Sequence, residues 1–282
     1  MVKFKLSAFS DEYSPSLDEQ IEGLITSKIR MTELRGVDGI NVSDLTQFQA
    51  SDVHKKLESS GISVSAIGSP IGKIKITDPF EPHLDKLKNT CEIADILYAS
   101  RIRMFSFYIP DGKYDEYKNE VIDRLGKMLD VADEYGVKLC HENEKGIYGD
   151  TPERCLEILD EFDGRLGCVF DPANFIQCGQ ETLSAWEMLK GHVQYLHIKD
   201  ALSNGTVVPA GKGEGHLTEI LTDFVSRGGT AVTIEPHLKV FDGLNALELD
   251  SARSAVDDYQ YKTTDSAFDA ACAALRKVLE GI

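Results

Sequence analysis

The 282-residue sequence predicts a single-domain (β/α)8 barrel, the fold also called a TIM barrel. Short apolar segments rich in β-branched residues alternate eight times with longer segments of helical apolar spacing, at about 35 residues per repeat. The chain contains no stretch rich in proline, glycine and serine and no block of like charges that would mark a domain boundary. Residues 1–282 are therefore predicted to form one domain. A doubly wound open sheet is the competing fold, but its common GxGxxG motif does not follow the first predicted strand.

Eight segments are predicted to form the strands of the barrel. They lie at residues 3–10, 31–36, 63–68, 101–108, 137–143, 166–171, 193–199 and 231–236. Because a helical segment separates each strand from the next, the strands are expected to pair in parallel. The clearest amphipathic helices lie at residues 14–27, 79–97, 114–136 and 150–162. In the last of these, Asp150 is the expected N-cap and Pro152 stands in the first turn.

The composition argues against several classes of partner. The chain carries 47 acidic and 30 basic residues, a net charge of −17, which opposes binding to nucleic acid and to anionic lipid. No apolar run reaches the roughly 18 residues of a membrane helix. The six cysteines show no CxxC spacing, and the N-terminal residues alternate like a strand instead of forming the apolar core of a signal peptide. The sequence therefore predicts a cytoplasmic protein without a nucleic-acid or membrane partner.

Four successive strands, the fifth to the eighth, end in residues that can bind a metal. Glu142 lies at the end of the fifth strand, Asp171 ends the sixth, His197 lies near the end of the seventh and Glu235 near the end of the eighth. In a (β/α)8 barrel these ends share one rim. Three carboxylates so close together repel one another unless a cation lies between them. Three oxygen donors and one imidazole suit Mn²⁺, Mg²⁺, Co²⁺ or Zn²⁺.

Each of these residues also has an ordinary structural interpretation. An aspartate before a proline usually caps a helix or begins a turn, and a single histidine in an apolar strand usually belongs to the core. Four such residues at equivalent positions of four consecutive strands are harder to explain in that way. The pattern therefore favours a site for one divalent metal ion.

The sequence also resembles the xylose isomerase-like TIM barrels, and among them the sugar phosphate isomerase/epimerase family. The resemblance extends over essentially the whole chain, and five motifs together make it specific: HENE (141–144), VFDPANF (169–175), LHIKDA (196–201), VPAGKGEG (208–215) and IEPH (234–237). In that family the matching positions bind one divalent metal, and two glutamates also transfer protons. The resemblance implies metal binding by Glu142, Asp171, His197 and Glu235, with Glu142 and Glu235 as the catalytic pair.

The chemistry that follows is proton transfer beside a carbonyl group of a sugar or sugar phosphate. A divalent metal that holds the carbonyl oxygen and a neighbouring hydroxyl would stabilise an ene-diolate. Return of the proton to the same carbon would make the protein an epimerase, and return to the neighbouring carbon would make it an isomerase of carbohydrate metabolism. An inosose-type dehydratase, in which the enolate expels a β-hydroxyl, is the alternative on the same site. A non-catalytic sugar-binding barrel is a further alternative.

Five other residues are candidates for binding the substrate: Asn174, Lys199, Arg35, Lys73 and His237. Asn174 stands where many relatives carry a histidine that touches the substrate, and an amide can still bond a hydroxyl. Lys199 shares its side of the strand with His197, and its alternative is a solvated lysine of the rim. For Arg35 a salt bridge to an acid of a neighbouring strand is equally favoured.

Other motifs near the predicted rim receive structural interpretations. Strand alternation turns His141 toward the helices, and Arg103 is expected to be a packing residue of the fourth strand. The GKGEG segment (211–215) lacks the GK[ST] ending of a P-loop and is interpreted as a flexible loop of a lid over the mouth. Lys212 in that loop is compatible with a phosphorylated substrate, because TIM barrels often bind phosphate near the last two strands.

A nuclease is a rival function for a barrel of this kind. Apurinic endonucleases of the same superfamily use three zinc ions, which need several extra histidines at the mouth of the barrel. Of the seven histidines in this chain none ends one of the first strands, Asn174 replaces one likely ligand, and the net charge of −17 opposes DNA binding. A nuclease is therefore not favoured.

The acidic connector at residues 241–262 is compatible with a cover over its own barrel, a cover over a neighbouring barrel or a surface excursion. The sequence leaves a homo-oligomer open.

Overall fold

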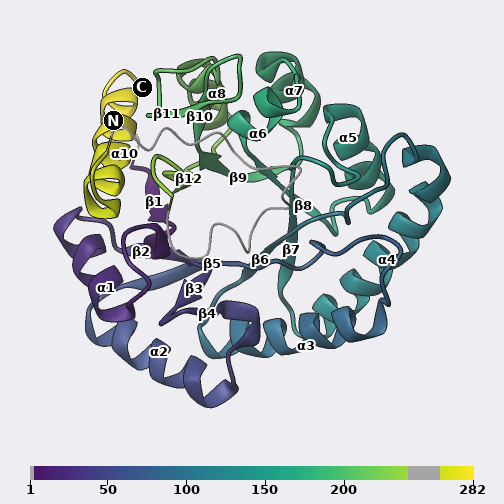
Figure 1. Cartoon of the computed structure of the whole chain (residues 1–282), viewed down its shortest axis with the longest axis horizontal. Helices are drawn as coiled ribbons and strands as arrows, with labels where there is room; N and C mark the ends of the chain where they lie inside the picture. Colours follow the sequence, from purple (N-terminus) through teal and green to yellow (C-terminus); the bar gives the residue numbers. More distant parts are fainter. Residues whose placement is uncertain (1–2, 241–260) are drawn as a thin grey trace.

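Eight parallel strands close into a barrel in the computed structural model, which describes residues 3–240 and 261–282 (Figure 1). Around the ring the order is β1, β2, β5, β6, β7, β8, β9 and β12, with β12 paired to β1. Their bounds are Lys5–Ala8, Met31–Leu34, Ser63–Gly68, Arg101–Met104, Lys138–Glu142, Gly167–Phe170, Val193–Ile198 and Ala231–Ile234. The predicted (β/α)8 barrel is confirmed, and each predicted strand contains one of these eight.

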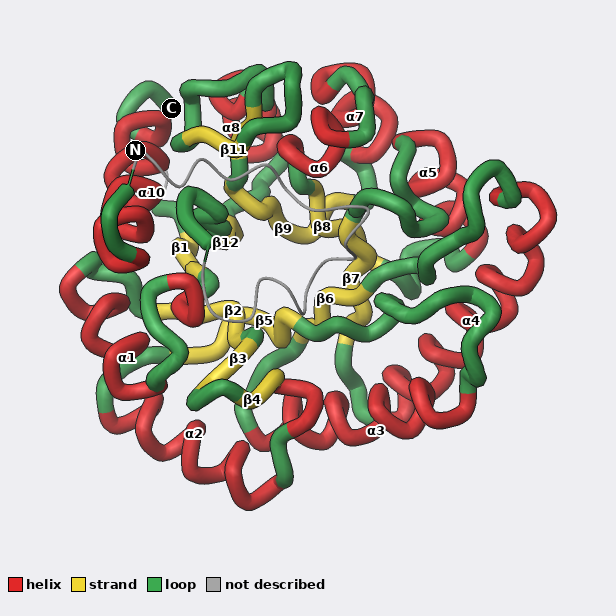
Figure 2. Tube along the Cα trace, in the orientation of Figure 1, coloured by secondary structure: helices red, strands yellow, loops and turns green. Residues whose placement is uncertain are grey.

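The helices form a ring outside the barrel, which Figure 2 shows in red around the yellow strands. They are α1 (Leu17–Thr26), α2 (Gln47–Ser59), α3 (Glu81–Ile96), α4 (Tyr114–Glu134), α5 (Pro152–Glu161), α6 (Pro172–Gln177), α7 (Thr182–Leu189), α8 (Leu217–Ser226) and α10 (Thr264–Leu279). In the described ranges, none of them combines the length and the apolar character needed to span a bilayer. Most of the connector at 241–262 lies outside the described residues.

The structure corrects the start of α5 and adds short elements that the sequence analysis did not predict. Thr151, not Asp150, is the N-cap of α5, since its side chain accepts the hydrogen bond from the Arg154 backbone. Two small hairpins lie outside the barrel: β3 (Gly36–Val37) with β4 (Ile40–Asn41), and β10 (Asp200–Ala201) with β11 (Val207–Val208). The 3-10 helices η1 (Ser10–Glu12) and η2 (Val42–Asp44) complete the loops. Such two- and three-residue elements leave no periodic pattern in a sequence.

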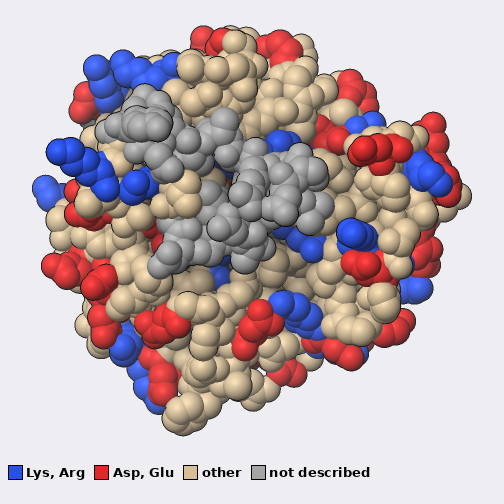
Figure 3. All heavy atoms as spheres, viewed as in Figure 1, with Lys and Arg blue, Asp and Glu red and all other residues tan. Residues whose placement is uncertain are grey.

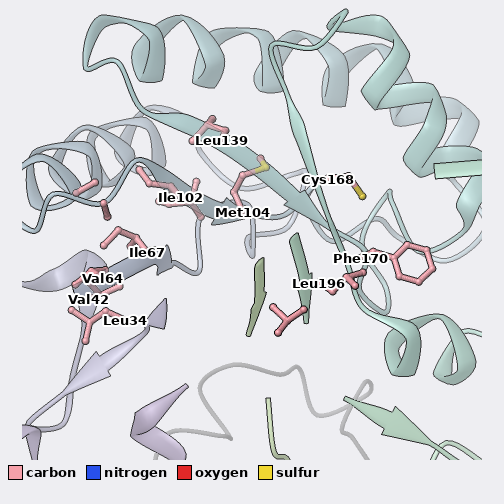
Figure 4. Close-up of a cluster of buried hydrophobic side chains, with 14 of the residues drawn as sticks. Leu34, Val42, Val64, Ile67, Ile102, Met104, Leu139, Cys168, Phe170 and Leu196 are labelled. Carbon is pink, nitrogen blue, oxygen red and sulfur yellow. The ribbon is translucent and has the colours of Figure 1, made fainter. Parts of the chain in front are cut away.

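The core is a continuous apolar layer between the barrel and the helices. Figure 4 shows part of it, where Ile67, Ile102 and Leu139 lie on three adjacent strands. Successive side chains of a strand face opposite sides of the sheet, so Ile102 and Met104 belong to this outer layer and Arg103 between them faces the barrel interior. Apolar burial therefore fixes the register that turns the polar residues inward.

Acidic and basic side chains are interspersed over the face of the molecule seen along the barrel (Figure 3). On the described part of this face, basic residues do not gather into one broad surface. Inside the barrel, by contrast, the strand ends bring buried ionisable groups together.

A buried histidine supports the loop after β5. His83 of α3 is 8% exposed, and its Nε2 accepts a hydrogen bond from the Gly72 backbone N–H at 2.7 Å. Gly72 has φ +89°, and a Cβ at this position would lie 2.0 Å from the Phe105 carbonyl oxygen. Burial, assisted by the Lys86 and Arg124 charges, lowers the pKa of His83 from 6.5 to about 4.

We expect this histidine to make the fold sensitive to acid. Between the unfolded pKa near 6.5 and the folded pKa near 4, only the unfolded chain takes up the proton, so stability falls as pH decreases through this window. The loss from this one group is about 3 kcal/mol on going from about pH 7 to below pH 4. In urea unfolding, His83→Gln should lose less stability over this range than the wild type. Identical pH profiles would contradict this assignment.

Candidate metal centre

The structure brings the four predicted ligands together at one end of the barrel. Glu142 is the last residue of β7, Asp171 directly follows β8, His197 lies in β9 and Glu235 directly follows β12. One ligand atom from each residue lies within 4.8 Å of those from the other three. Each of the four residues is at most 4% exposed. Four consecutive strands of the ring therefore deliver three carboxylates and one imidazole to a single buried point.

Contacts with His197 and Lys199 link the three carboxylates of the site. His197 Nδ1 lies 2.9 Å from Glu142 Oε1 and 3.6 Å from Glu235 Oε2. The ammonium group of Lys199 lies 3.1 Å from that same Glu235 oxygen and 2.9 Å from Asp171 Oδ2. The four atoms in these contacts, Glu142 Oε1, Asp171 Oδ2, His197 Nδ1 and Glu235 Oε2, are called the inner atoms below.

The second oxygen of each carboxylate is held from outside this centre. Glu142 Oε2 pairs with Arg103 Nη1 at 2.8 Å. Asp171 Oδ1 accepts a hydrogen bond from the Asn174 backbone N–H at 2.9 Å, because Asp171 is the N-cap of α6. Glu235 Oε1 lies 3.4 Å from Arg35 Nη1. Each carboxylate is thus oriented by a fixed donor, and its other oxygen is left to face the centre.

The electrostatics of the site favour ionised glutamates. Burial opposes ionisation, but the charges of His197 and Arg103 lower the pKa of Glu142 to about 2. Lys199, His237 and His197 likewise lower the pKa of Glu235 well below its usual value against the effect of burial. For Asp171 burial prevails, although Lys199 opposes it, and raises the pKa to about 7. The carboxylates are therefore unequal, because the effect of burial prevails at Asp171 and not at the two glutamates.

These residues fit a divalent metal ion. Asp171 Oδ2 is buried and makes no hydrogen bond within the described residues, since its contact with Lys199 lacks hydrogen-bond geometry. Three carboxylates that are buried together need concentrated positive charge between them. Oxygen and imidazole donors of this kind suit Mn²⁺, Mg²⁺, Co²⁺ and Zn²⁺ alike.

The five predicted substrate residues have different surroundings. Arg35, Lys73, Lys199 and His237 line a pocket beside Glu142 and Glu235, which Arg103 and Glu144 also line. Asn174 is not among the residues of this pocket. Its amide donates to the Asn143 carbonyl at 2.9 Å and lies 3.4 Å from Glu142 Oε1.

The charged candidates are already engaged in ion pairs. Arg35 binds Asp11 through two nitrogens at 2.7 and 3.0 Å and Glu12 at 3.0 Å, so the salt-bridge interpretation of Arg35 describes its contacts. Lys73 pairs with Glu144 at 3.0 Å and lies over the Phe105 ring. The side chain of His237 lies 3.2 Å from Glu12 Oε1. A substrate that binds these basic side chains would have to compete with the carboxylates that already pair with them.

The sequence analysis did not assign three residues to the site. Arg103 is not a packing residue, because its guanidinium pairs with Glu142. Asn143 exchanges two hydrogen bonds with the Asp171 backbone, at 2.9 and 3.0 Å. Glu33 of β2 is fully buried and contacts His197. A carboxylate in the middle of an apolar strand, on the same side as Arg35 two residues later, was the available signal for Glu33.

His141, predicted to be structural, does face away from the centre. Its Nε2 lies 2.9 Å from the Ser106 hydroxyl, and burial lowers its pKa to about 3. His141 therefore remains neutral at physiological pH and serves the packing of the loops.

The glycine-rich loop after β9 is anchored around one buried carboxylate. The backbone N–H groups of Gly211, Gly213 and Gly215 each donate to Asp200 at 2.9 Å. This arrangement gives the glycines a structural role, and the lid over the mouth stays a prediction. Lys212 between them is exposed and does not line the pocket.

This loop yields a stability prediction. A Cβ at position 213 would lie 2.3 Å from the Ala201 carbonyl oxygen, so Gly213→Ala must displace backbone. We expect a loss of about 1–3 kcal/mol in the free energy of unfolding, measured by urea denaturation. Gly191→Ala is the matched control, because nothing in the described part of the chain lies within 4 Å of that position. Equal stability of the two variants would contradict the anchoring role.

Comparison with known proteins places the chain among similar barrels. The family model of the xylose isomerase-like TIM barrel matches residues 29–262. No match is found among functionally curated proteins.

Three solved structures show the same fold at low sequence identity. The probable 3-DHS dehydratase AsbF from Bacillus anthracis, involved in petrobactin synthesis, has a TM-score of 0.73 at 16% identity, covering 98% of this chain and 99% of its own. The IOLI protein with a bound zinc atom has a TM-score of 0.74 at 17% identity, covering 98% of both chains. D-psicose 3-epimerase from Clostridium cellulolyticum H10, solved with D-tagatose, has a TM-score of 0.71 at 15% identity and covers 98% of both chains.

Proposed function

The chain belongs to the family of xylose isomerase-like TIM barrels, and from this membership we propose that it is a divalent-metal-dependent isomerase or epimerase of a sugar or sugar phosphate. The observation that carries the proposal is the buried meeting of three carboxylates and one imidazole at the ends of four neighbouring strands. A D-psicose 3-epimerase and a zinc-binding protein share the fold.

The residues that would hold the metal are Glu142, Asp171, His197 and Glu235, through the inner atoms defined above. When bound, the ion supplies positive charge that stabilises the anion formed when a proton leaves the carbon beside a carbonyl. Mn²⁺, Mg²⁺, Co²⁺ and Zn²⁺ remain the candidates, because the donor set does not select among them.

Glu142 and Glu235 are the proposed proton-transferring pair. They come from different sides of the site, on β7 and after β12, with His197 Nδ1 between them. The lowered pKa values keep both ionised at neutral pH, so each can accept a proton from the substrate. Arg103 and Arg35 favour the ionised carboxylates and so promote the return of the proton.

A dehydratase is the second candidate, because the fold is shared with a probable 3-DHS dehydratase. Such a reaction needs an acid for the departing hydroxyl. Lys199 is the residue placed for this role, because its ammonium group lies 2.9 Å from Asp171 Oδ2 and 3.1 Å from Glu235 Oε2, inside the site.

Proton exchange with solvent tests the proposal. The metal-loaded protein would be incubated in D₂O with ketoses, sugar phosphates and inososes, and deuterium uptake beside the carbonyl would be followed by NMR. We expect metal-dependent uptake with one substrate class, accompanied by an epimer, an isomer or an unsaturated product. Stoichiometric sugar binding without any uptake would instead indicate a non-catalytic binding barrel.

A further inference from the structure

We propose that Glu33 is a positioning residue for His197, which keeps the imidazole proton on Nε2 and directs Nδ1 toward the metal. The inference rests on the proposed function, because it concerns how this chain prepares its single nitrogen ligand. Glu33 lies on β2, across the barrel from β8 and outside the four ligand-bearing strands.

The carboxylate of Glu33 is fully buried and surrounded by donors. Its Oε2 lies 3.0 Å from His197 Nε2 and accepts a hydrogen bond from the Thr233 hydroxyl at 2.8 Å. Its Oε1 accepts a hydrogen bond from the Tyr195 hydroxyl at 3.0 Å. Donors from β9 and β12 thus fix an acid of β2, and all three partners lie inside the barrel.

The ring of His197 is fixed in orientation as well. Phe9 and Tyr195 contact it edge-on, with ring centroids 5.1 and 5.5 Å away. Its Nε2 faces Glu33, and its Nδ1 faces Glu142 and Glu235 on the opposite side. A rotation of the ring would break both sets of contacts within a close-packed interior.

An imidazole can bind a metal only through a nitrogen that carries no proton. A carboxylate beside Nε2 keeps the proton there, which leaves the Nδ1 lone pair free and makes it a stronger donor. Glu33 itself is not placed to be a ligand, since it lies beyond the imidazole and its oxygens already accept bonds from Thr233 and Tyr195. The contacts therefore suit orientation of the ligand instead of direct metal binding.

Glutamine is the sharpest replacement for testing this role. Glu33→Gln preserves the volume of the side chain, removes its charge and replaces one acceptor oxygen by an NH₂ donor. Glu187→Gln on α7 is the matched control, because it makes the same chemical change at an exposed residue that pairs with Lys190.

The test is the affinity for Zn²⁺, measured by competition with a chromophoric chelator. We expect Glu33→Gln to bind Zn²⁺ about 10–100-fold more weakly than the wild type, with Glu187→Gln unchanged within about threefold. A Glu33→Gln variant that folds and binds as tightly as the wild type would overturn the inference alone. Failure of the wild type to bind any of Zn²⁺, Mn²⁺, Co²⁺ and Mg²⁺ would overturn the proposed function and this inference together.

NMR of the wild type provides a second readout that does not depend on the folding of any variant. With ¹⁵N-labelled histidine and bound Zn²⁺, we expect His197 to show a proton on Nε2 and none on Nδ1. A proton on Nδ1, or an Nε2 without one, would overturn the positioning role.

Discussion

Replacing Glu235 or Glu142 by glutamine is expected to lower the rate of substrate proton exchange with solvent by at least about 10³-fold. Glutamine keeps the shape of the side chain and can still offer an oxygen to a metal, but it cannot accept a proton. Each glutamate lies within 4.8 Å of the other proposed ligands, so loss of the metal is the competing explanation. The rates should therefore be compared at saturating metal, with bound metal quantified in each variant.

The control for this experiment is Glu187→Gln on α7. Glu187 is exposed and pairs only with Lys190 among the contacts of the described residues, so the same chemical change should leave exchange unaltered. Full exchange in both single variants would contradict the proposed pair.

Removal of the metal is expected to abolish activity and to lower the thermal stability of the protein. A ligand present at a thousand times its dissociation constant stabilises the folded state by about 4 kcal/mol. For a chain of this size the shift in Tm is roughly 10 °C. The effect is expected to be large because Glu142, Asp171 and Glu235 are buried in one site. Without the ion, their mutual repulsion is offset only by the neighbouring basic side chains.

Calorimetry before and after treatment with a chelator measures this effect. We expect Tm to fall on chelation, to recover on addition of one divalent ion, and to show little response in Asp171→Asn. Asp171 is the informative position, since burial raises its pKa to about 7 and its Oδ2 makes no hydrogen bond within the described ranges. A chelated protein with unchanged Tm and unchanged proton exchange would contradict a metal-dependent function.

The sequence predicted the barrel well because its signals are local. An apolar strand followed by an amphipathic helix repeats along the chain, and a closed ring of parallel strands is the structure that accommodates eight such units. The strand ends were less accurate. The fourth predicted strand ran to residue 108, whereas β6 ends at Met104, because buried loop residues such as Phe105 and Phe107 continue the apolar pattern beyond the sheet.

The candidate site could be predicted where it follows from strand order alone. Glu142, Asp171, His197 and Glu235 occupy equivalent strand ends, so the fold brings them together. The supporting residues could not be predicted in this way. The partners of Arg103 and Glu33 depend on which way each strand turns its side chains and on the stagger between strands, and neither is visible in a single strand's sequence.

The most direct measurement is anomalous diffraction from crystals of the protein grown with Mn²⁺ or Zn²⁺. The account predicts one strong anomalous peak at about 2.0–2.3 Å from atoms of Glu142, Asp171, His197 and Glu235. A peak at any other group of residues, or no peak at these four in the presence of excess metal, would contradict it.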